Sequence, residues 1–94
     1  MKVILSITIM RTNGGLHAIL HKEIETEIVP IPGAGVEDSA WNEPRVPTRI
    51  ECNFTEGHYF LDFGTVLRDT EKECIQEANM YEDHYWRKPG ADLP

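Results

Sequence analysis

The first ten residues alternate between two kinds of position. On one side of an extended chain, residues 2–10 would carry four aliphatic side chains: Val3, Leu5, Ile7 and Ile9. The other side would be mixed, with two polar and two apolar side chains: Ser6, Thr8, Ile4 and Met10. Successive side chains of a strand point to opposite faces of a sheet. The pattern therefore predicts a strand over residues 2–10 with one buried face and one mixed face.

Residues 16–29 fit two periodicities. Three glutamates alternate with aliphatic or β-branched residues, as in a half-buried strand: Glu23, Glu25 and Glu27. Ile19, in contrast, fits only the apolar stripe of a helix. The preceding Asn13-Gly14-Gly15 turn favours a hairpin over a helix start. We keep a helix as the alternative and predict a strand over residues 16–29, whose inward side would hold Leu16, Ala18, Leu20, Ile24 and Ile28.

The clearest pattern lies between residues 46 and 67. Two alternating runs, 46–54 and 58–67, flank a turn in which Gly57 supplies the left-handed conformation. They predict a β-hairpin. On its first strand, Cys52 would face the core as a small apolar residue. The inward side of its second strand would hold Tyr59, Leu61, Phe63, Thr65 and Leu67.

A helix is predicted over about residues 70–88. Thr70 and Glu73 have the spacing of a capping box, in which a hydroxyl and a carboxylate satisfy amides at the helix N-terminus. Pro89-Gly90 would end the helix. Its apolar stripe would hold Cys74, Ile75, Ala78, Tyr81 and Tyr85.

Residues 30–45 form an irregular loop in this reading, because four of the six prolines lie between residues 30 and 47 and proline removes backbone donors. The assembled elements predict an α+β fold, an antiparallel meander of four to five strands with one C-terminal α-helix. The proline-rich segment leaves open a sheet curled into a small open barrel. If residues 16–28 were helical, the order βαββα would give half of a ferredoxin-like sandwich.

The length of 94 residues predicts a single domain over residues 1–94. Asp and Glu total 16 against 9 Lys and Arg, and the formal net charge of −7 argues against direct nucleic-acid binding.

No apolar run is long enough to span a membrane. Arg11 directly follows the first apolar run, without the small residues of a signal-peptide cleavage site. Since Cys52 and Cys74 are the only cysteines, we expect two free thiols and a cytoplasmic location.

Side chains that could carry chemistry do not converge in the predicted fold. His17 and His21 would stack on a helix, but on a strand they would lie about 13 Å apart, too far to share a metal ion. Cys74 has glutamates around it, which oppose formation of a thiolate. Asp83 and His84 point in different directions on a helix. We therefore expect no catalytic residue, no cofactor and no metal ion, and predict that the protein is not an enzyme.

Two surfaces stand out in the sequence. Outward apolar side chains and the tryptophan of the proline-rich loop form a candidate partner contact: Ile4, Met10, Ile19, Trp41 and Phe60. In that arrangement Trp41 would fold over the other four side chains. Carboxylates form a candidate acidic surface: Glu23, Glu25, Glu27, Glu71, Glu73, Glu77, Glu82 and Asp83.

These surfaces lead to three hypotheses. The first is a non-enzymatic domain that binds a protein partner or associates with itself, for example as a homodimer. The second is an acidic inhibitor, of a kind found among small phage or plasmid proteins, that occupies the basic nucleic-acid site of a partner. The third is a small-ligand-binding domain that uses residues 30–47, since a connection of that length in a compact domain is often functional.

Overall fold

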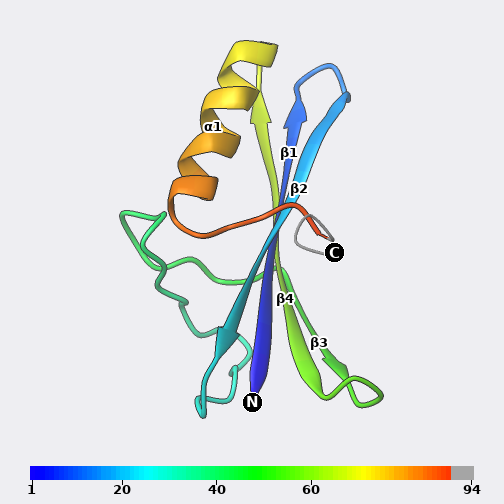
Figure 1. The fold of residues 1–94 in the computed structure, drawn as a ribbon, viewed down its shortest axis with the longest axis vertical. Helices are drawn as coiled ribbons and strands as arrows, with labels where there is room; N and C mark the ends of the chain where they lie inside the picture. The colour runs from blue at the N-terminus through cyan, green and yellow to red at the C-terminus, as the bar shows by residue number, and fades with distance from the viewer. Residues whose placement is uncertain (90–94) are drawn as a thin grey trace.

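The computed structural model describes residues 1–89 of the chain. Its central feature is a four-stranded sheet with the strand order β2-β1-β4-β3 (Figure 1). The strands are β1 (Lys2–Arg11), β2 (Leu16–Glu25), β3 (Arg49–Asn53) and β4 (His58–Arg68). One helix, α1 (Glu71–Asp83), follows the last strand.

The sheet is mixed rather than purely antiparallel. β1 pairs antiparallel with β2 and parallel with β4, and β4 pairs antiparallel with β3. The α+β class and the C-terminal helix are confirmed, but the continuous meander is wrong, because the second hairpin places β4 rather than β3 beside β1. β1 and β4 carry many aliphatic side chains, and these are buried most completely when the two strands lie side by side in the centre of the sheet. β3 is short and polar, so it is better suited to the edge. The sheet stays open and does not curl into a barrel.

Residues 16–25 form a strand, so the helical alternative and the βαββα order are wrong. β2 nevertheless ends at Glu25 rather than at residue 29, and β3 begins at Arg49 rather than at residue 46. The connection over residues 26–48 is therefore longer than predicted. Its prolines prevent regular pairing over most of its length. It contains one isolated antiparallel bridge, between Val36 and Arg45.

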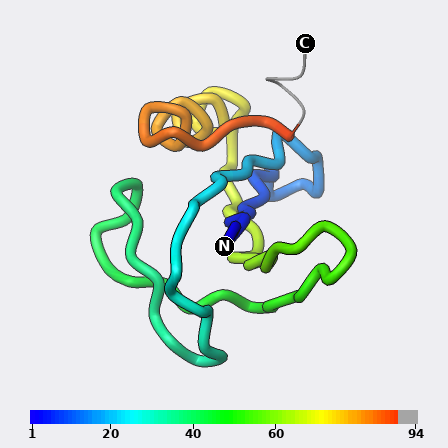
Figure 2. The backbone as a smooth tube through the Cα atoms, turned by 60° about the horizontal axis from the view of Figure 1, so that its bottom comes forward, coloured from blue at the N-terminus to red at the C-terminus, as the bar shows by residue number. Residues whose placement is uncertain are grey.

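α1 and the loop of residues 26–48 lie on the same side of the sheet, which we call the inner face (Figures 1 and 2). In Figure 1, α1 lies beside the upper part of the sheet and the loop beside the lower part. The inner side of β1 is almost fully buried, as its pattern predicts: Val3, Leu5, Ile7 and Ile9. The other elements complete the core with Ala18, Leu20, Trp41, Leu61, Cys74, Ala78, Tyr81 and Trp86.

The N-terminus of α1 has the predicted Thr70 N-cap, but the Glu73 carboxylate accepts from the Thr70 hydroxyl rather than from the backbone amide that a full capping box requires. The Thr70 hydroxyl accepts a hydrogen bond from the backbone N–H of Glu73 at 3.1 Å and donates one to the Glu73 carboxylate at 3.0 Å. An N-cap of this kind stabilises a helix by about 1 kcal/mol relative to alanine. The sequence signal for the start of the helix is therefore confirmed.

The C-terminus of α1 comes earlier than predicted, at Asp83 rather than near residue 88. Tyr85 adopts a positive φ of 72° and turns the chain back towards the sheet. This turn lets Arg87 and His21 exchange two backbone hydrogen bonds of 2.7 Å at the free edge of β2. It also buries Trp86 completely. Gly90, the second residue of the predicted helix stop, lies outside the described residues.

β4 contains a bulge at Gly64. Asp62 pairs with Ser6 and Thr65 pairs with Thr8, so β4 has one extra residue between these two pairs. Gly64 has a φ of 83°, and its N–H donates to the Asp62 carboxylate at 2.8 Å. The bulge reverses the alternation beyond it. Val66 packs against the core, and the predicted inward positions of Thr65 and Leu67 are wrong.

Cys52 is exposed, although its partner Tyr59 packs against the core. Cys52 therefore lies on the inner side of β3, but its expected burial is wrong, because β3 is an edge strand that the inner layer covers only in part. Cys74, by contrast, belongs to the buried side of α1 and is fully buried. Both thiols are free.

Candidate functional site

Four of the five residues predicted to contact a partner lie on one face of the sheet, opposite α1. Ile4 pairs with Phe60 across β1 and β4, and Thr8 pairs with Ile19 across β1 and β2. Met10 follows Thr8 by two positions on β1 and therefore shares its face. We call this the outer face. No helix of the described residues packs on it.

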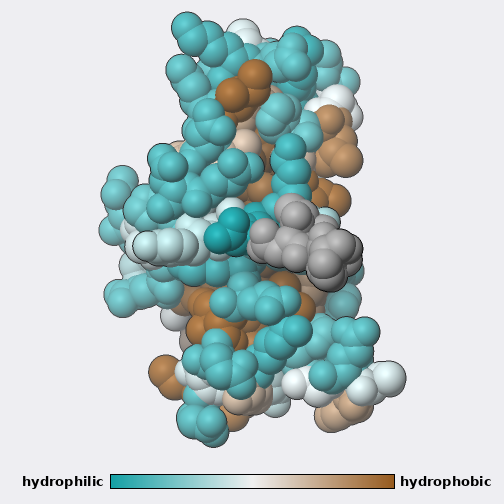
Figure 3. Space-filling view, viewed as in Figure 1, coloured by the Kyte–Doolittle hydropathy of each residue, from teal (hydrophilic) through white to brown (hydrophobic). Residues whose placement is uncertain are grey.

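Apolar side chains concentrate at the end of the outer face nearest the β1–β2 turn. Met10 pairs with Leu16 on one side and with Leu67 on the other, and Ile19 lies in the next row. Leu16, Ile19 and Leu67 are 61%, 40% and 53% exposed. Figure 3 shows apolar surface at its upper right, on the side away from α1. We call Met10, Leu16, Ile19 and Leu67 the outer apolar patch.

The sequence pattern missed Leu16 and Leu67 because an irregularity in pairing separates each of them from the regular part of its strand. Between Ile9 and Met10 the register with β2 shifts, so that Ala18 pairs with Ile9 but Leu16 pairs with Met10. This shift turns Leu16 to the outer face, and the bulge at Gly64 does the same for Leu67. A glycine within an alternating strand is a signal for a bulge. That signal was present at Gly64.

A polar row crosses the middle of the outer face. Ser6 lies between His21 of β2 and Asp62 of β4, and Asp62 pairs with Arg49 of β3. Burial lowers the pKa of His21, an effect that the charge of Glu23 opposes. No side-chain hydrogen bond joins Ser6 to His21 or Asp62 in the described part of the chain. The row therefore lacks the contacts of a catalytic triad.

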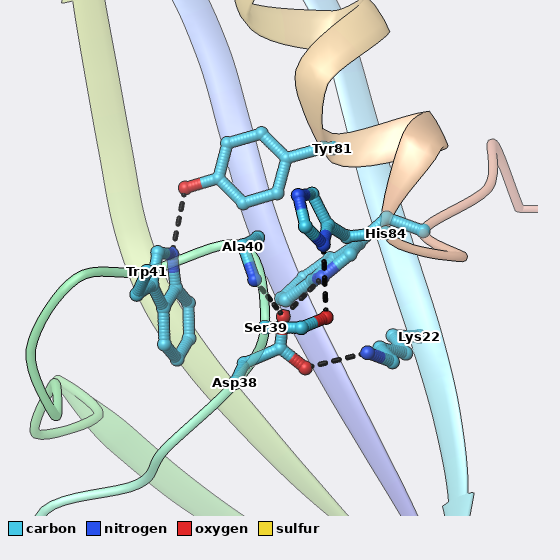
Figure 4. Close-up of polar contacts among 8 residues, drawn as sticks. Lys22, Asp38, Ser39, Ala40, Trp41, Tyr81 and His84 are labelled. Atoms are coloured by element: carbon cyan, nitrogen blue, oxygen red, sulfur yellow. Dashed lines mark hydrogen bonds and ion pairs between the residues drawn. The ribbon is translucent and has the colours of Figure 1, made fainter.

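Trp41 does not cover the outer face. It is 8% exposed and lies in the inner layer, where its ring centroid is 4.7 Å from that of Phe63 and 5.7 Å from that of Trp86. Its Nε1 donates to the Tyr81 hydroxyl at 2.9 Å (Figure 4). The Arg45 guanidinium lies over the indole, 5.0 Å from the ring centroid. The structure thus separates Trp41 from the other four candidate contact residues and uses it to complete the protein's own core.

Asp38 is the polar centre of the same cluster (Figure 4). One carboxylate oxygen lies 2.6 Å from Lys22 Nζ, and the other accepts hydrogen bonds of 3.0 Å from Trp86 Nε1 and the Ala40 backbone. Burial alone would raise the pKa of Asp38, but these donors and the Lys22 charge outweigh it and lower the pKa. Sequence reasoning missed the cluster, because Asp38 and Trp86 are 48 positions apart.

Ser39 and His84 form a hydrogen bond of 3.0 Å between the hydroxyl and Nδ1 (Figure 4). A serine and a histidine in contact are two of the parts needed for nucleophilic catalysis. A third group must orient the imidazole, and paired donors must stabilise an oxyanion. Within residues 1–89 no carboxylate is hydrogen-bonded to His84. The pair serves to hold the loop against the C-terminal end of α1.

The candidate acidic surface is divided between two parts of the fold. Glu23 and Glu25 belong to the lower end of β2, and Glu27 follows it in the loop, whereas the other five carboxylates lie on α1 (Figure 1). Several of them have internal partners. Glu25 and Glu27 lie 3.1 and 3.8 Å from the amino terminus, and Glu77 lies 2.8 Å from Arg68. The fold therefore does not assemble all eight carboxylates into one surface.

Among residues 1–89, no group of three or more His, Cys, Asp or Glu side chains is arranged to hold a metal ion. His17 and His21 lie on β2, where their spacing separates them along the strand. A helix long and apolar enough to cross a membrane is also absent from this part of the chain.

Comparisons with protein-family models, with curated proteins and with solved structures found no match for this chain.

Proposed function

We propose that this protein is a non-enzymatic interaction domain that associates with a second copy of itself through the outer face of the sheet. The observation that carries the proposal is the outer apolar patch. Its four side chains lie on three neighbouring strands, and three of them are at least 40% exposed. Apolar surface of this kind gains about 25 cal/mol for each Å² that is removed from water.

A second copy is a suitable partner on grounds of charge. The chain carries a net charge of −7, yet none of the four patch residues is charged. Two copies can therefore bring their patches together without placing carboxylates directly opposite one another. A two-fold dimer, in which the same patch serves on both subunits, is the commonest form of protein oligomer.

Sedimentation equilibrium over a range of protein concentrations tests the proposal. We expect the wild type to dimerise and the Ile19→Asp/Leu67→Asp variant to remain monomeric, since each aspartate would be buried without a partner. Ile75→Asp is the matched control, because Ile75 is 45% exposed but lies on α1. A wild type that stays monomeric at the highest soluble concentration would refute the proposal. The proposal would also be refuted if Ile75→Asp dissociated the dimer as fully as Ile19→Asp/Leu67→Asp does.

We further propose that the protein works in the reducing cytoplasm. The support is that Cys52 is exposed and Cys74 buried, with both thiols free. Exposed free thiols persist in reducing compartments and become oxidised elsewhere. Thiol labelling in intact cells before lysis, followed by mass spectrometry, should find Cys52 labelled. A Cys52 that is blocked as a disulfide in that assay would contradict the location.

A further inference from the structure

The loop of residues 26–48 leaves an opening over the inner face below α1. A groove of about 660 Å³ lies there between the sheet and the loop. Its floor comes from three strands and its walls from the loop, and the apolar members include Val3, Ile24, Leu61, Ile28, Pro30 and Val36. Figure 3 shows apolar surface in the lower half of the view, where the loop meets the strands. We call this the apolar groove. Its volume is within the range of about 300–1,000 Å³ that small-molecule sites occupy.

The walls of the groove are held in place. Val36 and Arg45 exchange backbone hydrogen bonds of 2.8 and 2.9 Å across the loop. Arg45 also lies over Trp41 and places Nη1 3.5 Å from the Tyr81 hydroxyl, which anchors this part of the loop to the core. Pro30 and Pro44 line the groove with fixed φ angles. The groove is therefore formed before any ligand arrives.

A second, acidic hollow adjoins the apolar groove. It has a volume of about 340 Å³, and Glu37 and Pro44 line both spaces. Three carboxylates line the hollow: Glu37, Asp38 and Glu43. Lys22 neutralises Asp38 at 2.6 Å, whereas Glu37 and Glu43 form no ion pair with any residue of the described range. Lys and Arg are absent from the described lining of both spaces.

We propose that the apolar groove and the acidic hollow together bind a small amphipathic cation, with its apolar body in the groove and its ammonium group between Glu37 and Glu43. Burial of the alkyl body supplies affinity, and the two carboxylates select a positive head group over a negative one. Arg45, the one cation among residues 26–48, lies over Trp41 and near the Tyr81 hydroxyl, and it forms no ion pair with Glu37 or Glu43. The site lies on the inner face, so it is separate from the outer apolar patch.

Three probes of equal chain length test the charge selection: decylammonium, decanoate and decanol, each below its aggregation limit. Amide chemical shifts of the labelled protein report both affinity and location. We expect decylammonium to shift the amides of Ile24, Val36 and Glu37 saturably, leave those of Ile19 and Leu67 unchanged, and bind about tenfold more tightly than decanoate. Equal affinity for decanoate would overturn the proposal. Shifts confined to the outer face, or no saturable binding of decylammonium, would also overturn it.

Two pairs of variants separate the site from the general negative charge of the chain. Glu37→Gln/Glu43→Gln should weaken decylammonium binding about tenfold and leave decanol binding unaffected. The control Glu71→Gln/Glu82→Gln changes the net charge by the same amount, but at exposed sites on α1. It should leave decylammonium binding unchanged. Ile28→Ser should weaken all probes that bind the groove, and Ile31→Ser should not. Ile28 and Ile31 are 78% and 66% exposed, so both variants should fold, but only Ile28 lines the groove. Equal effects within either pair would overturn the proposal.

Discussion

Lys22 Nζ lies 2.6 Å from Asp38 Oδ1, and this ion pair joins the middle of β2 to the loop that covers the lower inner face. The other oxygen of the same carboxylate accepts from Trp86 Nε1, so the C-terminal segment is attached to the same point. The Lys22 and Asp38 side chains are 17% and 3% exposed. One carboxylate thus connects three segments that are distant in the sequence.

Asp38→Asn should lower the free energy of unfolding by about 2–4 kcal/mol, because it leaves the Lys22 ammonium largely buried without a counter-charge. Lys22→Met/Asp38→Asn should recover part of that loss. Urea unfolding of the wild type, both single variants and the double variant gives the coupling energy between the two side chains. The exposed pair Arg49 and Glu51, 2.9 Å apart, is the control and should couple by less than about 1 kcal/mol. Similar coupling in both pairs would contradict the prediction.

Tyr81→Phe should destabilise the fold by about 1–3 kcal/mol, because it leaves the Trp41 Nε1–H without its acceptor in the core while keeping the ring. Tyr85→Phe is the matched control. Tyr85 is 74% exposed, so the loss of its hydroxyl should change stability by less than about 0.5 kcal/mol. Thermal and urea unfolding measure both effects. If the two variants were equally stable, the Trp41–Tyr81 hydrogen bond would make no net contribution to the free energy of unfolding.

Local patterns in the sequence were sufficient for the strands, both hairpins and the Thr70 cap, because each depends on residues a few positions apart. Local patterns did not predict the order of the strands. Whether β3 or β4 lies beside β1 depends on how much apolar surface each of them buries against the rest of the fold, which is not a local property. Local patterns also could not locate Trp41. Its position depends on Tyr81, 40 positions later, and on a turn at Tyr85 that no glycine or asparagine marks.

Gly64→Ala should cost about 1–2 kcal/mol, because an L-residue at a φ of 83° is strained. Crowding is not the cause. A Cβ at this position would lie 3.5 Å from Thr48 Cγ2, which is an ordinary contact. Gly64→Asn should therefore cost less than Gly64→Ala, since asparagine tolerates the left-handed region better. Urea unfolding of the two variants compares them directly. An asparagine variant less stable than the alanine variant would show that the bulge depends on space rather than on backbone conformation.

His21 should make stability depend on pH. Its ring lies edge-on to Phe60 at 5.5 Å, beside Ser6 of β1, and burial lowers its pKa although Glu23 opposes this. Because the folded pKa is below the unfolded value of about 6.5, the folded state binds fewer protons in the interval between them, and stability rises with pH there.

The stability that neutral His21 contributes is therefore fully present above about pH 6.5 and is lost as the pH falls through the folded pKa. Acidification from about pH 7.5 to about pH 5.5 should lower the unfolding free energy of the wild type more than that of His21→Gln. Unfolding in urea at one fixed protein concentration measures this, which keeps any self-association constant across the series. His17→Gln is the matched control, because it removes an imidazole from the same strand that is not packed against Phe60. If His21→Gln and the wild type lost stability in parallel, the titration would belong to another group.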